Sequence, residues 1–423
     1  MANLTHIALA LVDTAMISRV STEALAAAAV ASSVNIAAGM LFGGWATAAQ
    51  VIAARRFGEG RPADIGRLLD VSLLVGAGAG LMVLLALSIG AGPLLTAFGV
   101  SEAVRSEGVP YLRALACAAP LAGSTAMFRA VYAGMGETSA AMRMTFLVNA
   151  INIPLNYVLI FVAGWGLLGA GVGTAISIAA GCAYMGQFGW RRFRSTYELF
   201  RIGHLRQSRD TLLRLWTMGW PETAMLFLSY TNNVLVLRIV ASLGTSVIAG
   251  MQVVTNIQQV IWTVIWALST GVSIAVGHSL GTRDMGAVAP TERAGLLLMV
   301  AVPAVLLAPV LVAPSAILHL LTPDSAVVSE ARGVLIILAL QVPFMASSMT
   351  LAAVLRAAGD SKWIFYASTV SSYLVMVPLS WLLAIPLGWE LAGVYVAGIA
   401  FFAARTGGSW WRYRQGKWRL AEI

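Results

Sequence analysis

The most regular feature of the chain is a series of long apolar stretches separated by short charged ones. Asp, Glu, Lys and Arg are absent from residues 24–54, 71–101, 144–190, 239–282, 294–323, 333–355 and 363–389. A helix that crosses a bilayer needs about 20 mostly apolar residues, so each stretch can hold one span and 144–190 can hold two. The pattern predicts twelve membrane helices, at 3–20, 30–54, 68–97, 109–134, 142–163, 167–190, 212–241, 247–277, 293–321, 332–356, 363–386 and 389–407.

The first predicted helix is shorter than the others, which leaves open a start upstream of Met1. The run has no basic segment before it and carries Asp13 in its core. Both features differ from a cleavable signal peptide, so we expect this segment to be a membrane helix.

The composition excludes a set of soluble domains. Apolar residues make up 59% of the 423 residues, charged residues only 11%, and the mean hydropathy is +0.82. Soluble chains carry about 25% charged residues. Both cysteines, Cys117 and Cys182, lie in apolar runs, which argues against a disulfide framework and against a zinc site.

The net charge of +9 is distributed unevenly over the predicted loops. If odd and even loops alternate sides, 21 of the 27 Lys and Arg residues lie on one side and only four on the other. Cytoplasmic loops are the cation-rich ones, so this predicts that both termini are cytoplasmic in a multi-pass protein of the cell membrane. We expect the cations to set topology and to contact anionic lipid, not nucleic acid.

Short glycine-containing motifs occur twice. Gly58 and Gly281 follow the second and eighth predicted helices, and Gly136 and Gly359 follow the fourth and tenth; each pair is 223 residues apart. Gly-Ala-Gly-Val at 169–172 also matches Leu-Ala-Gly-Val at 391–394, at an offset of 222. The fold predicted is therefore all-α, with two six-helix lobes related by a pseudo-two-fold axis along the membrane normal.

This repeat predicts a domain organisation. We expect an N-lobe at 1–190, a basic cytoplasmic linker at 191–211, a C-lobe at 212–407 and a basic cytoplasmic tail at 408–423. Part of the linker is expected to form an amphipathic helix on the anionic membrane surface. Two such lobes enclose a cleft that alternating access can open to one side and then the other.

Several motifs together resemble the multidrug and toxic compound extrusion (MATE) family. They are Leu11-Val-Asp-Thr-Ala-Met16, Phe57-Gly-Glu-Gly60, Gly134-Met-Gly-Glu-Thr138, Asn152-Ile-Pro-Leu-Asn156, Gly219-Trp-Pro221 and Leu355-Arg-Ala-Ala-Gly-Asp360. Their order, spacing and double occurrence carry the resemblance, which extends from Asp13 to Trp418. It implies a twelve-helix exporter that exchanges H⁺ or Na⁺ for an amphipathic, often cationic, organic solute.

Asp13 is the first candidate for ion coupling. It lies near the middle of the first helix, where a carboxylate costs about 2.5–3.5 kcal/mol on insertion scales. Burial favours the neutral form of such a group and wetting favours the ionised form, which is what a proton carrier needs. The resemblance also implies this role, because the family places its coupling acid in the same Val-Asp-Thr motif. The alternative is a structural Asp satisfied by a hydroxyl such as that of Thr14.

Asn149, Asn152 and Asn156 fall on one face of the fifth helix, because they are spaced by three and four residues. In many members of the resembled family the last position is an acid, and Asn156 removes that charge. This weakens the case for a tight Na⁺ site at Asp13, Asn152 and Asn156 without excluding it. Thr174 in the sixth helix completes the predicted network. Ordinary interhelical hydrogen bonding is the alternative.

The C-lobe offers fewer candidates. Glu222 follows Pro221 and is a candidate second titrating group, or a residue that merely faces the cleft. The resembled family's C-lobe acids would fall near Tyr230 and Ser347 or Ser348, none of which is acidic. Polar side chains within the C-lobe spans are candidates for a substrate cleft; they are Tyr230, Asn233, Gln252, Gln259 and Gln341. Ordinary helix packing is the alternative for each of them.

Five functions compete. A secondary antiporter driven by an H⁺ or Na⁺ gradient, monomeric and without a cofactor, fits best. The absence of a Gly-x-x-x-x-Gly-Lys-Ser/Thr loop argues against an ATP-driven pump. A flippase for a lipid-linked precursor, as in relatives of the same superfamily, would need cations deep in the spans to bind pyrophosphate. Almost no Arg or Lys lies there. A polytopic membrane enzyme would need a nucleophile–base pair or metal ligands, and the four His residues are scattered. A passive channel needs neither a repeat nor a buried Asp.

Overall fold

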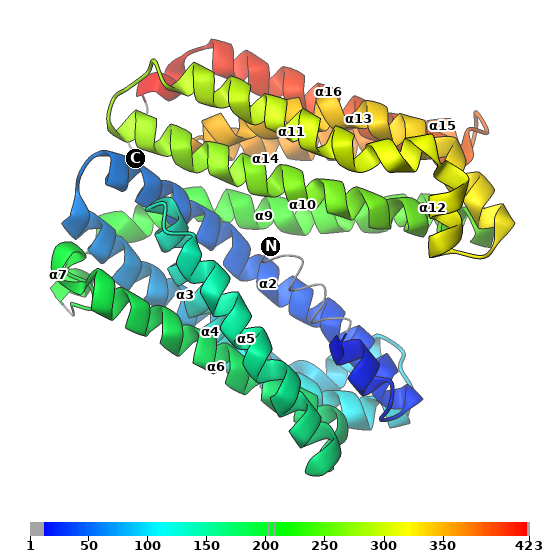
Figure 1. Cartoon of the computed structure of the whole chain (residues 1–423), viewed down its shortest axis with the longest axis horizontal. Coiled ribbons are helices and arrows are strands. Elements are labelled where there is room, and N and C mark those ends of the chain that lie inside the picture. Colours follow the sequence, from blue (N-terminus) through cyan, green and yellow to red (C-terminus); the bar gives the residue numbers. More distant parts are fainter. Residues whose placement is uncertain (1–11, 202, 207, 421–423) are drawn as a thin grey trace. The chain divides into compact units, whose positions relative to one another are not determined.

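The protein is helical throughout the part that the structure describes. This computed structural model describes residues 12–201, 203–206 and 208–420, and no strand occurs among them. The helices of the first half are α2 (Thr22–Gly58), α3 (Pro62–Ala97), α4 (Glu102–Gly134), α5 (Ser139–Tyr157), the π-helix η1 (Val158–Val162), α6 (Gly166–Arg192), α7 (Arg194–Tyr197) and α8 (Gly203–Arg206) (Figure 1). The others are α9 (Arg209–Ala241), α10 (Thr245–Gly281), α11 (Val288–Val312), α12 (Pro314–Leu321), α13 (Ser325–Ala357), α14 (Ser361–Val370), the π-helix η2 (Ser371–Met376), α15 (Val377–Ala384), α16 (Glu390–Arg414) and the 3₁₀-helix η3 (Lys417–Leu420).

Eleven helices of the described residues are long and apolar enough to cross a membrane. They coincide with the second to twelfth predicted helices, counting α5 with η1 and α14 with η2 and α15 as single spans. Of the first predicted helix, residues 12–17 are helical, and its predicted part at 3–11 lies outside the described residues. The prediction of an all-helical polytopic membrane protein is confirmed.

One predicted helix is interrupted. The sequence predicts a continuous helix over 293–321, whereas α11 ends at Val312 and α12 begins at Pro314. The residue before a proline is pushed out of the helical region by the pyrrolidine ring, and Ala313 accordingly has φ −128° and ψ 60°. Pro314 then takes the first position of α12, where its missing N–H costs nothing.

The chain divides into two compact units, Met1–Thr223 and Ala224–Ile423, and the division falls inside α9. The lobe, linker and tail boundaries drawn from the sequence at 190, 211 and 407 stay predictions.

Small residues bring the helices of the first unit close together. A Cβ atom on Gly76 of α3 would lie 2.6 Å from the carbonyl oxygen of Gly123 in α4, and one on Gly80 would lie 2.3 Å from that of Ala119. Glycine and alanine allow backbones to approach in membranes, where packing rather than the hydrophobic effect drives association.

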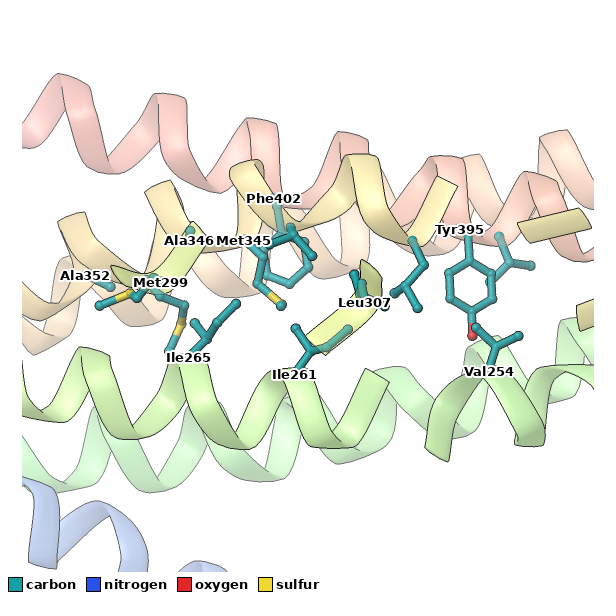
Figure 2. Close-up of a cluster of buried hydrophobic side chains, with 14 of the residues drawn as sticks. Val254, Ile261, Ile265, Met299, Leu307, Met345, Ala346, Ala352, Tyr395 and Phe402 are labelled. Carbon is teal, nitrogen blue, oxygen red and sulfur yellow. The ribbon is translucent and has the colours of Figure 1, made fainter. Parts of the chain in front are cut away.

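The core of the second unit contains large apolar side chains. Figure 2 shows the centre of its core, where Ile261 and Ile265 of α10 meet Met345 of α13 and Phe402 of α16. Their exposed fractions are all 6% or less.

The linker between the long helices α6 and α9 is held against α3. The buried carboxylate of Asp70 in α3 accepts hydrogen bonds from the backbone N–H groups of Phe200 (2.9 Å) and Arg201 (3.1 Å), and from Nδ1 of His204 (2.7 Å). Glu198 and Phe200 both have left-handed backbones, with φ of 53° and 62°. The helices here, α7 and α8, are only four residues long. The described part of the linker thus differs from the amphipathic helix that we expected.

The repeat extends to the backbone of the turns. Glu59 N–H donates to the carbonyl of Arg55 after α2, and Thr282 N–H donates to that of His278 after α10. Glu137 and Asp360 form a second such pair of turn amides, bonded to Tyr132 and Leu355. Both pairs keep the offset of 223.

The third match is shifted from the predicted alignment. Trp165 N–H donates to the carbonyl of Leu159, and Trp389 N–H donates to that of Leu383, in both cases over 3.0 Å. These equivalent turns set the offset at 224. Gly169 therefore corresponds to Gly393, and not to Leu391 as the offset of 222 predicted.

Candidate ion-coupling site

A chain of hydrogen bonds joins three segments of the first unit. Asn156 Nδ2 of α5 lies 3.0 Å from Asp13 Oδ1, in the helical turn 12–17, and 3.0 Å from Asn152 Oδ1. Asn152 Nδ2 in turn donates to Thr174 Oγ1 of α6 over 3.3 Å. The structure thus brings together Asp13, Asn152, Asn156 and Thr174, four residues singled out from the sequence.

The two amides of this chain are withdrawn from solvent. Asn152 and Asn156 are each only 1% exposed, while Asp13 is half-buried. Unpaired amides are costly to bury, and the i, i+4 spacing on α5 allows Asn156 to donate to Asn152. The carboxylate therefore lies at the more open end of a dry polar network.

Gly173 makes room for the network, and sequence reasoning missed it. A Cβ atom at this position of α6 would lie 2.1 Å from Asn156 Oδ1, far inside van der Waals contact. The position carries no polar atom, so only the packing of α5 against α6 reveals its role.

The side-chain amide oxygen of Asn156, Oδ1, is buried, and among the described residues it has no hydrogen-bond partner. Buried acceptors are ordinarily satisfied, so this oxygen is an available ligand for a proton donor or a cation. The network also holds a single carboxylate. The described residues contain no group of three or more His, Cys, Asp and Glu side chains that suits a metal ion.

The backbone of the fifth span changes character beside the site. Two residues after Asn156, at Val158, α5 passes into the π-helix η1, in which Ala163 N–H bonds to the carbonyl of Val158. π-helical turns are rare and occur frequently at functional sites. Pro154, which lacks an N–H group, interrupts the normal ladder just before them.

Tyr111 of α4 is a second residue that the sequence did not reveal. It lies near enough to Asp13 for their charges to interact, and it packs with Ile17 and Leu167 in a small buried cluster. Nothing in the pattern around residue 111 distinguishes it from an ordinary interfacial tyrosine.

Two further candidates lie apart from this chain of hydrogen bonds. Asn149 is buried on the same helix, with 7% of its surface exposed, but it does not bond to the four residues of the chain. Glu222 of α9 is 3% exposed and is likewise outside the chain. Its helix packs closely on α2, since a Cβ atom on Gly44 would meet Thr223 Oγ1 at 2.2 Å.

The substrate-cleft candidates of the second unit fall into two groups. Tyr230, Asn233, Gln252 and Gln259 have exposed side chains. Gln341 is only 4% exposed; its Oε1 accepts a hydrogen bond from Gln258 Nε2 over 3.2 Å, and its amide lies against Gly398. In the structure Gln341 is part of the packing of α10, α13 and α16.

Comparison with known proteins identifies the class. The family model MatE matches residues 1–158 and 221–382. A probable multidrug resistance protein NorM of Photorhabdus laumondii is 28% identical over 295 residues, which cover 68% of this chain and 64% of that protein. The multidrug resistance protein NorM of Vibrio cholerae is 28% identical over 377 residues, covering 87% and 81% of the two chains.

The fold agrees with the sequence comparison. The crystal structure of the Vibrio cholerae MATE transporter VcmN in its bent form superposes with a TM-score of 0.89 at 18% identity, over 100% of this chain and 95% of that one. These findings define a polytopic transporter. The chain belongs to the MATE family.

Proposed function

We propose that the protein exports amphipathic organic cations in exchange for protons, with Asp13 as the coupling carboxylate. The observation that carries this proposal is the hydrogen-bonded chain from Asp13 through Asn156 and Asn152 to Thr174. The names of the NorM relatives support export of drug-like compounds. We place the protein in the cytoplasmic membrane, and we expect it to act as a monomer without a cofactor.

The chemistry follows from the single carboxylate. When Asp13 is ionised, it accepts the N–H of Asn156 and leaves one negative charge at a half-buried position. Binding a proton or a cationic solute neutralises that charge, but the two cannot occupy it together. Competition for one carboxylate couples proton entry to solute exit, provided the site opens to the two sides in turn.

A proton suits this site better than Na⁺. In the observed arrangement the amide N–H groups of Asn156 and Asn152 point at the neighbouring oxygens, which a cation would have to displace. A hard cation prefers several converging oxygen ligands, and here only Asp13 supplies charge. The buried Asn156 oxygen is the one feature that favours Na⁺, so the experiment includes both gradients.

The test is transport of a fluorescent organic cation into or out of proteoliposomes under an imposed pH gradient or Na⁺ gradient. We expect wild-type transport to follow the pH gradient, and Asp13→Asn to lower it at least a hundredfold because the amide cannot titrate. The melting temperature and membrane content of the variant should stay near those of the wild type.

Asp324→Asn is the matched control. Asp324 caps the exposed N-terminus of α13 by accepting from Ala326 N–H, and asparagine caps helices equally well. This variant should transport like the wild type. Full activity of Asp13→Asn, or dependence on neither gradient, would refute the proposal. Dependence on Na⁺ alone would replace the proton by Na⁺ as the coupling ion.

A further inference from the structure

A cavity of about 190 Å³ lies in the first unit, where the end of α2 and the start of α3 meet the first turns of α9. Its charged lining consists of Arg56, Arg61, Arg67 and Arg214 together with Asp64 and Asp210. Four guanidinium groups therefore face two carboxylates around a space that holds several water molecules, or one tetrahedral anion.

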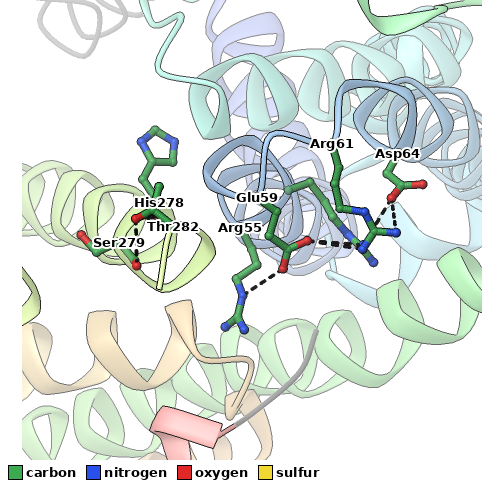
Figure 3. Close-up of polar contacts among 8 residues, drawn as sticks. Arg55, Glu59, Arg61, Asp64, His278, Ser279 and Thr282 are labelled. Carbon is green, nitrogen blue, oxygen red and sulfur yellow. Dashed lines mark hydrogen bonds and ion pairs between the residues drawn. The ribbon is translucent and has the colours of Figure 1, made fainter. Parts of the chain in front are cut away.

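The carboxylates are shared among more cations than they can neutralise. Asp64 is contacted by Arg61 at 2.6 Å, by Arg56 at 3.4 Å and by Arg67 at 3.5 Å. Glu59, outside the cavity lining, is contacted by Arg55 at 3.3 Å and by Arg61 at 3.5 Å (Figure 3). A positive charge excess remains around the cavity.

Arg214 is the clearest part of that excess. It is half-buried, and it makes no ion pair with any residue of the part of the chain that the structure describes. Arg56 experiences the repulsion of both Arg61 and Arg214. A half-buried cation is costly unless it is paired, and an anion in the cavity would offset both the burial of Arg214 and the mutual repulsion.

We propose that this cavity binds the phosphate group of an anionic molecule. Guanidinium groups match phosphate oxygens with two parallel hydrogen bonds, and the resulting charge-assisted bonds are about twice as strong as neutral ones. The cavity lies at the ends of membrane helices, and basic pockets at such positions bind lipid head groups. Phosphatidylglycerol, cardiolipin and free inorganic phosphate all present the required chemistry.

The experiment compares ligands and variants on the purified full-length protein. Native mass spectrometry counts bound phosphatidylglycerol, cardiolipin and, as the zwitterionic reference, phosphatidylcholine; thermal unfolding is followed with and without inorganic phosphate. We expect anionic lipid to bind in preference to phosphatidylcholine, and both Arg61→Gln and Arg214→Gln to weaken that binding about tenfold. The Arg61 side chain is 54% exposed, so its replacement leaves the fold intact.

Arg143→Gln is the control, because it removes the same charge from an exposed position of α5 that does not line the cavity. It should bind lipid like the wild type. Stabilisation by inorganic phosphate without lipid retention, lost in the same two variants, would identify free phosphate as the source of the anion. Equal lipid binding by all three variants, or stabilisation by neither ligand, would overturn the proposal.

Discussion

Asn156 shows how much one substitution in a familiar motif changes the chemistry of a site. As an amide it donates to Asp13 and to Asn152, each over 3.0 Å, instead of adding a second charge. The internal repeat gives a comparison, because at the offset of 224 Asn156 corresponds to the buried residue Ser380. The hydrogen-bonded chain of Asp13, Asn156, Asn152 and Thr174 therefore contains one carboxylate.

The addition of one methyl group at Gly173 tests whether the close packing of α5 on α6 is needed for the site. Gly173→Ala would place a Cβ atom 2.1 Å from Asn156 Oδ1, so α5 and α6 must separate or the amide must rotate away from Asp13. We expect transport to fall at least tenfold, and stability to fall by about 1–3 kcal/mol, the usual cost of overpacking. Proteoliposome transport and thermal unfolding measure the two effects.

Gly186→Ala on the same helix is the control, since its Cβ atom would make an ordinary contact of 3.9 Å with Phe128. That variant should keep both activity and stability. If Gly173→Ala transports normally, the hydrogen-bonded chain is not needed for coupling.

The polar residues of the site were predictable, and its packing was not. Asp13 is conspicuous because it interrupts an apolar run, and Asn152 and Asn156 share a helical face by spacing alone. Gly173 and Tyr111 were missed because their importance depends on which helices touch. The same reason hid Asp70 and His204, which lie 134 residues apart in the sequence and 2.7 Å apart in the fold.

At the scale of elements, the linker before α9 depends on Asp70. Its carboxylate accepts hydrogen bonds from two backbone N–H groups and from His204. The same segment contains Glu198 and Phe200, whose left-handed backbones cost free energy that these bonds must offset. Asp70→Asn should release this segment, because an amide oxygen accepts these bonds more weakly. We expect trypsin to cut after Arg201 about tenfold faster, because cleavage follows the population of the opened segment.

Glu198→Gln provides the comparison, because it removes only an exposed ion pair to Arg201. Such pairs contribute little, so its cleavage rate should match the wild type. Equal rates for Asp70→Asn and Glu198→Gln would show that Asp70 does not hold the linker.

The backbone conformation of Glu390, the first residue of α16, should lower the stability of the protein by a measurable amount. Glu390 has φ 47°, whereas its counterpart in the repeat, at the start of α6, is Gly166 with φ 52°. A left-handed backbone strains any residue with a Cβ atom, so Glu390→Gly should raise the free energy of unfolding by up to about 1 kcal/mol. Glu107→Gly, inside α4 with an ordinary backbone, should lower it by about 1 kcal/mol. Thermal unfolding that shifts the same way in both variants would contradict this interpretation.

The predicted helices agree with the structure best where apolar runs are uninterrupted. The break at Ala313 was not predicted, although Pro314 directly after it is the residue that causes it. The helices of the linker, α7 and α8, are too short to show a periodic pattern of apolar residues. The predicted offset of the third repeat is wrong because three identical letters, the Ala-Gly-Val of 170–172 and of 392–394, indicate 222, whereas the equivalent turns at Trp165 and Trp389 lie 224 apart. Backbone hydrogen bonds settle that alignment.

At the scale of the whole molecule, the distribution of cations predicts the orientation. With 21 of 27 Lys and Arg residues in loops and tails on one side, both termini should be cytoplasmic. A green fluorescent protein fused to the C-terminus should fluoresce, while alkaline phosphatase at that position should be inactive. Alkaline phosphatase fused after Gly99, in the turn between α3 and α4, should be active. The reverse pattern would refute the orientation.

The single carboxylate of the proposed coupling site also determines which part of the proton gradient can do work. One carboxylate carries one proton per cycle, and a solute of charge +1 leaving as that proton enters transfers no net charge. Such an exchange is electroneutral, so the membrane voltage neither drives nor opposes it. The transporter would then respond to pH difference alone, with each pH unit sustaining about a tenfold solute gradient, because one pKa unit and a tenfold concentration ratio correspond to the same free energy.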